Sequence, residues 1–339
     1  MNILITGGAG YIGSHVVKAL LETTDYKITI IDNLSTGDYS TINTLEQIAQ
    51  EFNRTFYFHK ADLSDFSAIE NIFISNHFDA IIHFAASIVV SESVENPLKY
   101  YLNNTVNTTH LIQCAEKYGI KQFIFSSTAA VYGEPDAPSV SETTPTKPIN
   151  PYGMSKLMSE TVLGDTAAAH PELKFVILRY FNVAGASIDN KIGQSFPNAT
   201  HLIKIAAECA AKKREKMYIF GKNYPTSDGT CIRDYIHIED LASAHLASLE
   251  YLKSGGKSDI FNCGYGRGYS VTEVINTMKK VSNIDFSVEE GLPREGDPSQ
   301  LIANNKKILD TLPWIPKYND LSLICRTGLA WEQKMIQTQ

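Results

Sequence analysis

A tyrosine and a lysine four residues apart are the side chains in this sequence best suited to proton transfer. Tyr152 and Lys156 follow Asn150 and Pro151, which suit an N-cap and the first helical position, so a helix is predicted to begin there. Residues four apart share one face of a helix, which brings the phenol near the ammonium group. A free phenol has a pKa of about 10 and is a poor base unless positive charge stabilises the phenolate. The pair predicts a tyrosine base assisted by a lysine.

A hydroxyl stands close to this helix at the end of a predicted strand. The strand Gln122 to Ser126 runs into Ser127 and Thr128 shortly before the helix begins. An isolated Tyr-x-x-x-Lys spacing is usually a solvated helix face. Here it follows the carboxyl edge of a predicted sheet, where open α/β sheets bind ligands. Thr128 is therefore predicted to join the proton-transfer pair, with Ser126 beside the cofactor.

A glycine-rich turn follows the first predicted strand. The segment Thr6-Gly7-Gly8-Ala9-Gly10-Tyr11-Ile12-Gly13 leads directly into a helical pattern. Gly7, Gly10 and Gly13 would let a diphosphate approach the backbone at a helix N-terminus, where unpaired N–H groups favour anions. Such glycines also occur in ordinary loops. Asp32 ends the second predicted strand, 19 residues after Gly13. Its carboxylate can bond the adenosine ribose and repel a 2′-phosphate, which favours NAD over NADP.

Two other groups fall at the ends of the third and fourth predicted strands. They are Asp62 and the segment Phe84-Ala85-Ala86, whose small residues would let a cofactor lie close. Each group alone is as consistent with a structural role as with a functional one. A nicotinamide beside the tyrosine and lysine predicts removal of a proton from an alcohol, coupled to hydride transfer.

The elements that must position these residues alternate along the first half of the chain. Short β-branched and aromatic runs, bounded by turn residues, alternate with segments that carry apolar residues three or four apart. Alternation of this kind predicts a parallel sheet with crossover helices, a Rossmann-like doubly wound α/β fold. The predicted strands are Asn2 to Ile5, Lys27 to Ile31, Thr55 to Phe58, Ala80 to Phe84, Gln122 to Ser126 and Phe175 to Arg179.

The second half has a looser pattern, rich in Gly, Asn, Pro and Ser. We expect residues 1–180 to form an NAD-binding domain and residues 181–339 a smaller, loop-rich α/β substrate domain. Within that half, Asp240 to Leu252 is predicted to be a helix and Asp259 to Asn262 a strand. Segments near 235–262 are expected to pack back on the first sheet.

Composition excludes several classes of protein. The 339 residues are 43% hydrophobic and 20% charged, with a formal net charge of -7 at pH 7. This is the make-up of a globular protein with no general attraction to nucleic acid or anionic membrane. Five widely spaced cysteines lack any metal-ligand spacing and are expected to be free thiols in the cytoplasm, without a metal. We expect no signal peptide and no membrane-spanning stretch.

Eight blocks spread over both halves resemble the extended short-chain dehydrogenase/reductase family, and within it the enzymes that epimerise UDP-sugars. The blocks are TGGAGYIGSH from Thr6, HFAA from His83, ESVENPLKYYLNN from Glu92, FSSTAAVYG from Phe125, NPYGMSK from Asn150, RYFNVAGA from Arg179, YPTSDGTCIRDYIH from Tyr224 and REGDP from Arg294. The resemblance implies interconversion of UDP-glucose and UDP-galactose by transient oxidation at C4 with tightly bound NAD. It also implies a homodimer, with contacts near Leu98 to Tyr118 and Pro151 to Asp165.

The same resemblance implies residue roles. Tyr152 would transfer the proton, Lys156 would lower its pKa and hold the nicotinamide ribose, and Thr128 would bond the reacting hydroxyl. NAD contacts are implied at Tyr11, Ile12, Asp32, Asn33, Asp62, Leu63, Phe84, Asn103 and Tyr180. UDP contacts are implied at Asn182, His201, Leu202, Phe220, Arg233 and Arg294, with Asp297 at the uridine ribose.

Departures from the family pattern concern the substrate. Related dehydratases carry acids just after the Thr128 position, whereas this chain has Ala129 and Ala130, which cannot transfer protons. Ile88 and His201 stand where lysine and asparagine are frequent in the family. Leu301 stands where residue size governs the room around the sugar. UDP-N-acetylglucosamine or UDP-glucuronate therefore remains an alternative substrate. A redox-active dehydrogenase and an idle NAD-binding regulator remain alternative functions.

Overall fold

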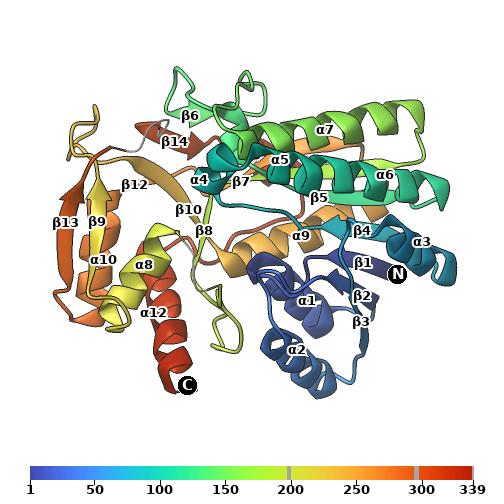
Figure 1. Ribbon diagram of the computed structural model, residues 1–339, viewed down its shortest axis with the longest axis horizontal. Coiled ribbons are helices and arrows are strands. Elements are labelled where there is room, and N and C mark those ends of the chain that lie inside the picture. The colour runs from blue at the N-terminus through green and yellow to red at the C-terminus, as the bar shows by residue number, and fades with distance from the viewer. Residues whose placement is uncertain (197–199, 294–297, 338–339) are drawn as a thin grey trace.

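A seven-stranded parallel sheet lies at the centre of the structure (Figure 1). The structure is a computed structural model that describes residues 1–196, 200–293 and 298–337. The strands of the sheet lie in the order β11-β7-β5-β4-β1-β2-β3, and the order reverses between β1 and β4. Doubly wound sheets bind ligands at such a reversal, outside the carboxyl ends of the strands. The strands are β1 (Asn2–Thr6), β2 (Lys27–Asp32), β3 (Phe56–Lys60), β4 (Ala80–His83), β5 (Gln122–Thr128), β7 (Lys174–Tyr180) and β11 (Asp259–Cys263).

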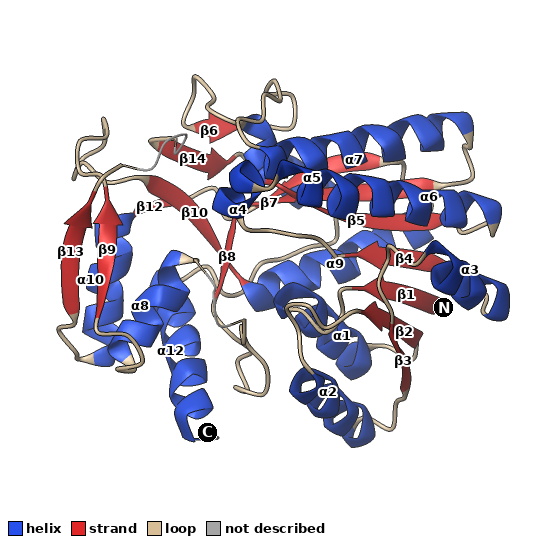
Figure 2. Ribbon diagram, viewed as in Figure 1, coloured by secondary structure: helices blue, strands red, loops and turns tan. Residues whose placement is uncertain are grey.

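Helices cover both faces of this sheet (Figure 2). One face packs against α1 (Tyr11–Thr23), α2 (Tyr39–Glu51) and α9 (Ile238–Lys253). The other packs against α3 (Phe66–Ser75), α6 (Asn107–Lys117) and α7 (Pro151–Ala169). Ile3 and Ile5 of β1 belong to the first apolar core, and Leu4 belongs to the second. The strands are apolar on both faces because both faces are covered, so the predicted fold class is confirmed.

The predicted strands are all present, with ends that differ by one or two residues. The predicted strand Thr55 to Phe58, for example, is β3, Phe56–Lys60. Between β4 and α6 lie α4 (Val90–Glu95), α5 (Pro97–Tyr100) and the π-helical turn η1 (Tyr101–Val106). A short 3-10 turn, η2 (Ala129–Tyr132), follows β5.

A second layered region is built from the chain after β7, joined by β6, which precedes β7 in the sequence. It contains a sheet in which β12, β10, β14 and β6 are neighbours and β8 pairs with β10, together with the two-stranded sheet β13-β9. These strands are β6 (Ser139–Val140), β8 (Asn182–Ala184), β9 (Lys216–Phe220), β10 (Ile232–His237), β12 (Gly268–Ser270), β13 (Ser287–Gly291) and β14 (Gln300–Ala303). The helices are α8 (Leu202–Ala210), α10 (Val271–Ser282), α11 (Lys306–Thr311) and α12 (Leu321–Gln337).

The chain returns from the second region to the first sheet. Strand β11 pairs with β7 over five residues, and α9 shares the apolar core of α1. The five cysteines are buried, and no disulfide joins any two of them in the described part of the chain. No helix of that part is long and apolar enough to span a bilayer.

Candidate active site

The glycine-rich turn lies at the reversal of strand order, between β1 and α1. Gly7 has a positive φ of 74°, and a Cβ atom there would lie 2.7 Å from the backbone nitrogen of Ala85. A Cβ atom at Gly13 would overlap the carbonyl oxygen of Gly7. The N-cap residue of α1 is Gly10, which has no side chain to cap the helix, so the helix dipole and the N–H groups of the first turn favour an anion. This turn fits the diphosphate of a dinucleotide.

Asp32 connects the glycine-rich turn to the turn after β2. Its two carboxylate oxygens accept hydrogen bonds from the backbone N–H groups of Ala9, at 2.9 Å, and Leu34, at 2.8 Å. Burial raises the pKa of Asp32, and these two hydrogen bonds oppose that rise. Each oxygen retains a lone pair for a ribose hydroxyl. Asn33 donates to Asp62 at 2.6 Å, which joins the ends of β2 and β3.

The other predicted NAD residues lie around the same edge. Phe84, Ala85 and Ala86 follow β4 and are partly exposed, and the Phe84 ring lies 4.9 Å from the His245 ring. Leu63 is buried after β3, and Tyr11 and Ile12 lie in the first turn of α1. Asn103 lies on η1, with its side-chain amide 3.0 Å from Ser87 Oγ. Ser126 lies near the end of β5, and Tyr180 ends β7 with its hydroxyl hydrogen-bonded to His245.

Tyr152 and Lys156 lie in the first two turns of α7. Asn150 caps the helix by accepting a hydrogen bond from the N–H of Gly153 at 2.8 Å, so the predicted helix start is confirmed. The Tyr152 phenol lies beside the hydroxyl of Thr128, close enough for the hydroxyl to influence its pKa. Lys156 is buried and donates to the carbonyl oxygen of Ser126 at 2.8 Å. The structure thus brings together the three residues predicted to carry out proton transfer.

Burial dominates the titration of this pair. It raises the pKa of the Tyr152 phenol, and the Thr128 hydrogen bond opposes the rise. It lowers the pKa of Lys156 to about 7, and the negative charge of Glu160 opposes that change. The phenol therefore needs nearby positive charge to act as a base at neutral pH. That Lys156 supplies part of this charge stays a prediction.

The predicted substrate residues lie in the second region. Asn182 begins β8, two residues beyond the end of β7, and shares a hydrogen bond with Tyr235. Arg233 of β10 pairs in register with Leu301 of β14, and Leu301 packs beside Ala129 in a small apolar core. Phe220 ends β9 and is partly exposed. Arg294 and Asp297 lie outside the described residues.

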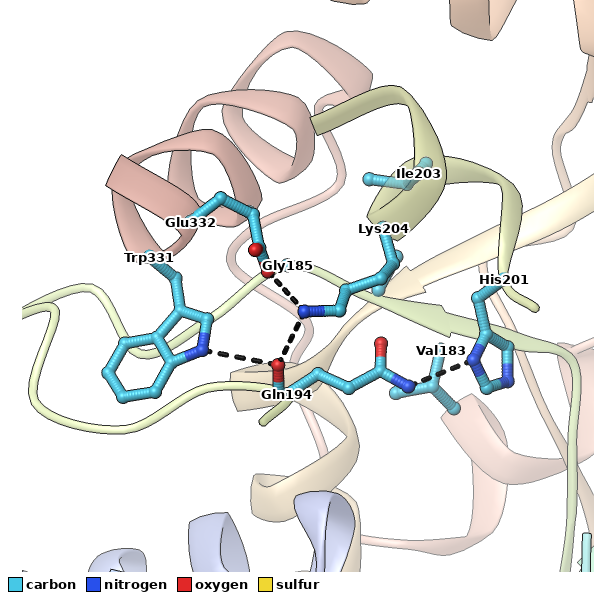
Figure 3. A pocket seen from close by; sticks show the side chains of 10 residues that line it. Val183, Gly185, Gln194, His201, Ile203, Lys204, Trp331 and Glu332 are labelled. Carbon is cyan, nitrogen blue, oxygen red and sulfur yellow. Dashed lines mark hydrogen bonds and ion pairs between the residues drawn. The ribbon is translucent and has the colours of Figure 1, made fainter. Parts of the chain in front are cut away.

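His201 and Leu202 lie at the start of α8, and His201 lines a small cavity of about 20 Å³ that could hold one water molecule (Figure 3). The amide of Gln194 is 2.9 Å from His201 Nδ1. The carbonyl oxygen of Gln194 accepts hydrogen bonds from Trp331, at 3.2 Å, and Lys204, at 3.0 Å. The sequence analysis missed this support for His201, because it includes Trp331, which lies 137 residues from Gln194 in the chain.

The sequence analysis also missed a buried ion pair beside Lys156. Glu160 and Arg179 form a salt bridge of 2.6 Å. One signal for it was present, since Glu160 follows Lys156 by four residues and so shares its helix face.

Comparison with known proteins places these features in a family. Residues 3–264 match the model of the NAD-dependent epimerase/dehydratase family. The chain is 46% identical over 337 residues to a UDP-glucose 4-epimerase of Azospirillum brasilense, covering 99% of this chain and 93% of the relative. It is 42% identical over 333 residues to one from Lacticaseibacillus casei, covering 98% and 97%.

Solved structures agree with the sequence matches. The UDP-Glc/GlcNAc 4-epimerase of Campylobacter jejuni is 57% identical, with a TM-score of 0.86 over 98% of this chain and 99% of that one. A UDP-glucose 4-epimerase of Stenotrophomonas maltophila, solved with NAD and formylated UDP-arabinopyranose, is 34% identical, with a TM-score of 0.94 over the full length of both chains.

Proposed function

Because the chain belongs to the NAD-dependent epimerase/dehydratase family, we propose that it is an isomerase that interconverts UDP-glucose and UDP-galactose at C4 of the hexose. The observation that carries the proposal is the placement of the Tyr152 phenol beside Thr128, with Lys156 one turn along α7 and bonded to the carbonyl oxygen of Ser126. Curated UDP-glucose 4-epimerases align with almost the whole chain, including the second region. NAD is the cofactor, as it is in homologous structures.

The residues present fit NAD. The glycine-rich turn and the start of α1 would hold the diphosphate, and Asp32 would bond the adenosine ribose. Lys156 would hold the nicotinamide ribose beside Tyr152. Bound NAD would supply a hydride acceptor at C4 of the sugar and positive charge near the phenol.

Tyr152 acts as the base for the sugar hydroxyl in this proposal. Its phenol removes the proton from O4 while Thr128 holds the same oxygen by a hydrogen bond, so the C4 hydride can leave and a carbonyl forms. Inversion requires the hexose to turn before Tyr152 returns the proton. Asn182 and Arg233 would hold the UDP, and the apolar side chain of Leu301 would leave the hexose free to turn.

Epimerisation is preferred to dehydration on this scaffold. The residues after Thr128 are Ala129 and Ala130, which carry no group to move a proton to or from C5 and C6. A dehydrogenase would consume added NAD in proportion to product, whereas an epimerase has no net redox change. The intact set of Thr128, Tyr152 and Lys156 argues against an idle NAD-binding regulator.

N-acetylated UDP-sugars are a second candidate substrate class. The structurally similar protein from Campylobacter jejuni is described as a UDP-Glc/GlcNAc 4-epimerase. Leu301 of this chain is smaller than a tyrosine and has no hydroxyl, which leaves room for an N-acetyl group near the hexose.

The molecule is proposed to act as a homodimer in the cytoplasm, with an NAD-binding domain of residues 1–180 and a substrate domain of residues 181–339. Apolar side chains gather on the exposed faces of α4, α5 and η1, where Val94, Leu98 and Leu102 are each more than half exposed. Such a patch favours a protein partner. Buried cysteines without disulfides suit a reducing compartment.

The deciding experiment incubates the purified protein with UDP-galactose and identifies the product sugar by NMR, without added NAD. We expect UDP-glucose to form until equilibrium, with no build-up of reduced cofactor. The Tyr152→Phe variant should bind NAD normally and lose about 10²- to 10⁴-fold in kcat. A wild type that forms no UDP-glucose, or a variant that keeps half of its activity, would contradict the proposal.

A further inference from the structure

Three buried polar residues form a row across the first sheet. Ser127 of β5 pairs in register with Arg179 of β7, which pairs with Asn262 of β11. Paired residues of neighbouring strands direct their side chains to the same face, so these three lie side by side. All three are at least 96% buried. Polar groups in such a place need partners, because burying them unpaired costs several kcal/mol.

Glu160 of α7 lies over this polar row and bonds two of its members. Ser127 donates its hydroxyl proton to Glu160 Oε1. Arg179 donates through Nε to Oε1 at 3.1 Å and through Nη2 to Oε2 at 2.6 Å. Both carboxylate oxygens are thus engaged, and the planar fork of the guanidinium fixes the direction of the Glu160 side chain.

Tyr132 of η2 connects the other end of the polar row. Its hydroxyl accepts a hydrogen bond from Arg179 Nη1 at 3.0 Å and donates to Asn262 Oδ1 at 2.6 Å. The Arg179 guanidinium also lies 5.0 Å from the Tyr132 ring centroid. The network therefore joins α7, β5, η2, β7 and β11.

The end of β5 holds three successive turns of α7. Thr128 lies beside the Tyr152 phenol, the carbonyl oxygen of Ser126 accepts a hydrogen bond from Lys156, and the hydroxyl of Ser127 bonds Glu160. Tyr152, Lys156 and Glu160 are spaced by four residues and share one helix face. A shift of α7 along β5 would break all three contacts at once.

We propose that Glu160, paired with Arg179 and bonded to Ser127, is a positioning residue that sets the register of α7 against β5 and so the place of Tyr152 beside Thr128. The inference rests on the proposed function. A buried ion pair often stabilises a fold no better than apolar residues of similar volume. Apolar side chains could fill the same space, so packing does not explain why these residues are polar. A contact that fixes the direction and register of α7 against β5 does explain it.

The charge of Glu160 also acts on Lys156. The charged and titratable groups that face the Lys156 ammonium are Glu160 on α7 and His83 on β4. Burial and the charge of Lys156 lower the pKa of His83 to about 3, so His83 is neutral at pH 7. Of these two groups, therefore, Glu160 is the one whose charge opposes the loss of the Lys156 proton. Arg179 balances the charge of Glu160 from β7.

The test compares two variants of the network with a matched control. Ser127→Ala leaves the ion pair in place and removes its bond to β5, and Glu160→Gln keeps the side-chain volume but removes the charge. Asp240→Asn is the control, because Asp240 is an equally buried carboxylate whose hydrogen bonds go to Tyr265 and the backbone of residues 317–318. Thermal melts followed by circular dichroism give the folded fraction of each protein.

We expect kcat per folded molecule to fall about 10-fold in Ser127→Ala and about 100-fold in Glu160→Gln, because small displacements of a base cost this much. The KM for UDP-glucose should stay within about 2-fold, since the lost contacts act on the transition state. Asp240→Asn should keep the wild-type kcat per folded molecule. Losses in the two network variants no larger than that of the control would overturn the proposal.

A second measurement does not depend on activity. NMR of protein labelled with [ε-¹³C]lysine follows the titration of Lys156, whose signal is assigned by its disappearance in Lys156→Met. The midpoint should move to lower pH in Glu160→Gln and stay in place in Asp240→Asn. An unmoved midpoint in Glu160→Gln would also overturn the proposal. A moved midpoint in a protein that forms no UDP-glucose would support the positioning role and refute only the proposed function.

Discussion

Lys156 shows how a single residue is placed for chemistry against its own solvation. Its ammonium group is buried between α7 and β5, where it donates to the carbonyl oxygen of Ser126 and lies 4.9 Å from the Phe125 ring. Burial lowers its pKa from 10.5 to about 7, so at neutral pH the group can be charged or neutral. A lysine in this state can hold a phenolate or ribose hydroxyl and still exchange a proton.

The lowered pKa predicts a pH-dependent stability difference between the wild type and Lys156→Met. Between about pH 7 and 10.5 the unfolded chain binds more protons at Lys156 than the folded protein, so wild-type stability rises with pH across this window. The variant lacks this contribution. In urea unfolding, the free energy of unfolding of the wild type minus that of the variant should increase by at least about 1 kcal/mol between pH 6.5 and 9.5. A difference that does not change with pH would mean that Lys156 is solvated in the folded state.

Leu301 predicts the breadth of the sugar pocket. The residue is buried beside Ala129 and Phe181 and is in register with Arg233, so a larger side chain must displace its neighbours or extend toward the sugar. We expect Leu301→Tyr to lower kcat/KM for UDP-N-acetylglucosamine by about 10- to 100-fold relative to UDP-glucose, by analogy with overpacking of about 1 to 3 kcal/mol. Measuring both substrates in both proteins checks this. An unchanged ratio would show that Leu301 does not limit the pocket.

At the scale of elements, local sequence signals placed the strands, the glycine-rich turn and the start of α7. Asn150 and Pro151 predicted where α7 begins because capping depends on residues adjacent in sequence. The polar row could not be predicted in the same way. Ser127, Arg179 and Asn262 meet only because β5, β7 and β11 are neighbours in register, and no local pattern specifies that register.

Gly13 is closely packed at the glycine-rich turn, whereas Gly164 on α7 faces open space, so alanine substitutions at the two positions should have opposite effects on stability. Gly13→Ala should destabilise the protein by about 1 to 3 kcal/mol, because its methyl group would overlap the carbonyl oxygen of Gly7. It should also weaken NAD binding. Gly164→Ala on α7 is the control, since nothing lies within 4 Å of its added methyl group. A helix interior gains about 0.5 to 1 kcal/mol from this change.

Urea unfolding and calorimetric titration of cofactor-stripped protein with NAD measure both effects of the glycine substitutions. Equal NAD affinity in Gly13→Ala and the wild type would show that the first turn of α1 does not hold the diphosphate. A destabilised Gly164→Ala would mean that this part of α7 is packed against a partner.

At the scale of the whole molecule, the two layered regions are joined by more than the chain that passes between them. The Tyr11 hydroxyl donates to the carbonyl oxygen of Gly185 at 2.6 Å, which connects the first turn of α1 to the segment after β8. Lys18 of the same helix forms salt bridges with Asp189 and Glu239, at 3.4 and 3.8 Å. The glycine-rich turn and the second region are therefore held in one arrangement.

The exposed apolar stripe on α4, α5 and η1 predicts how two copies assemble. Leu98 and Leu102 are 69% and 59% exposed, one helical turn apart, and burying each would contribute about 1.5 to 3 kcal/mol. The double variant Leu98→Glu/Leu102→Glu would place charges in that interface, so sedimentation velocity should show a mass near one chain instead of two. Ile315→Glu is the control, because Ile315 is 79% exposed but lies in the segment before α12. Circular dichroism should show both variants folded, since neither change touches the core. If the double variant sediments with the mass of two chains, the interface lies elsewhere.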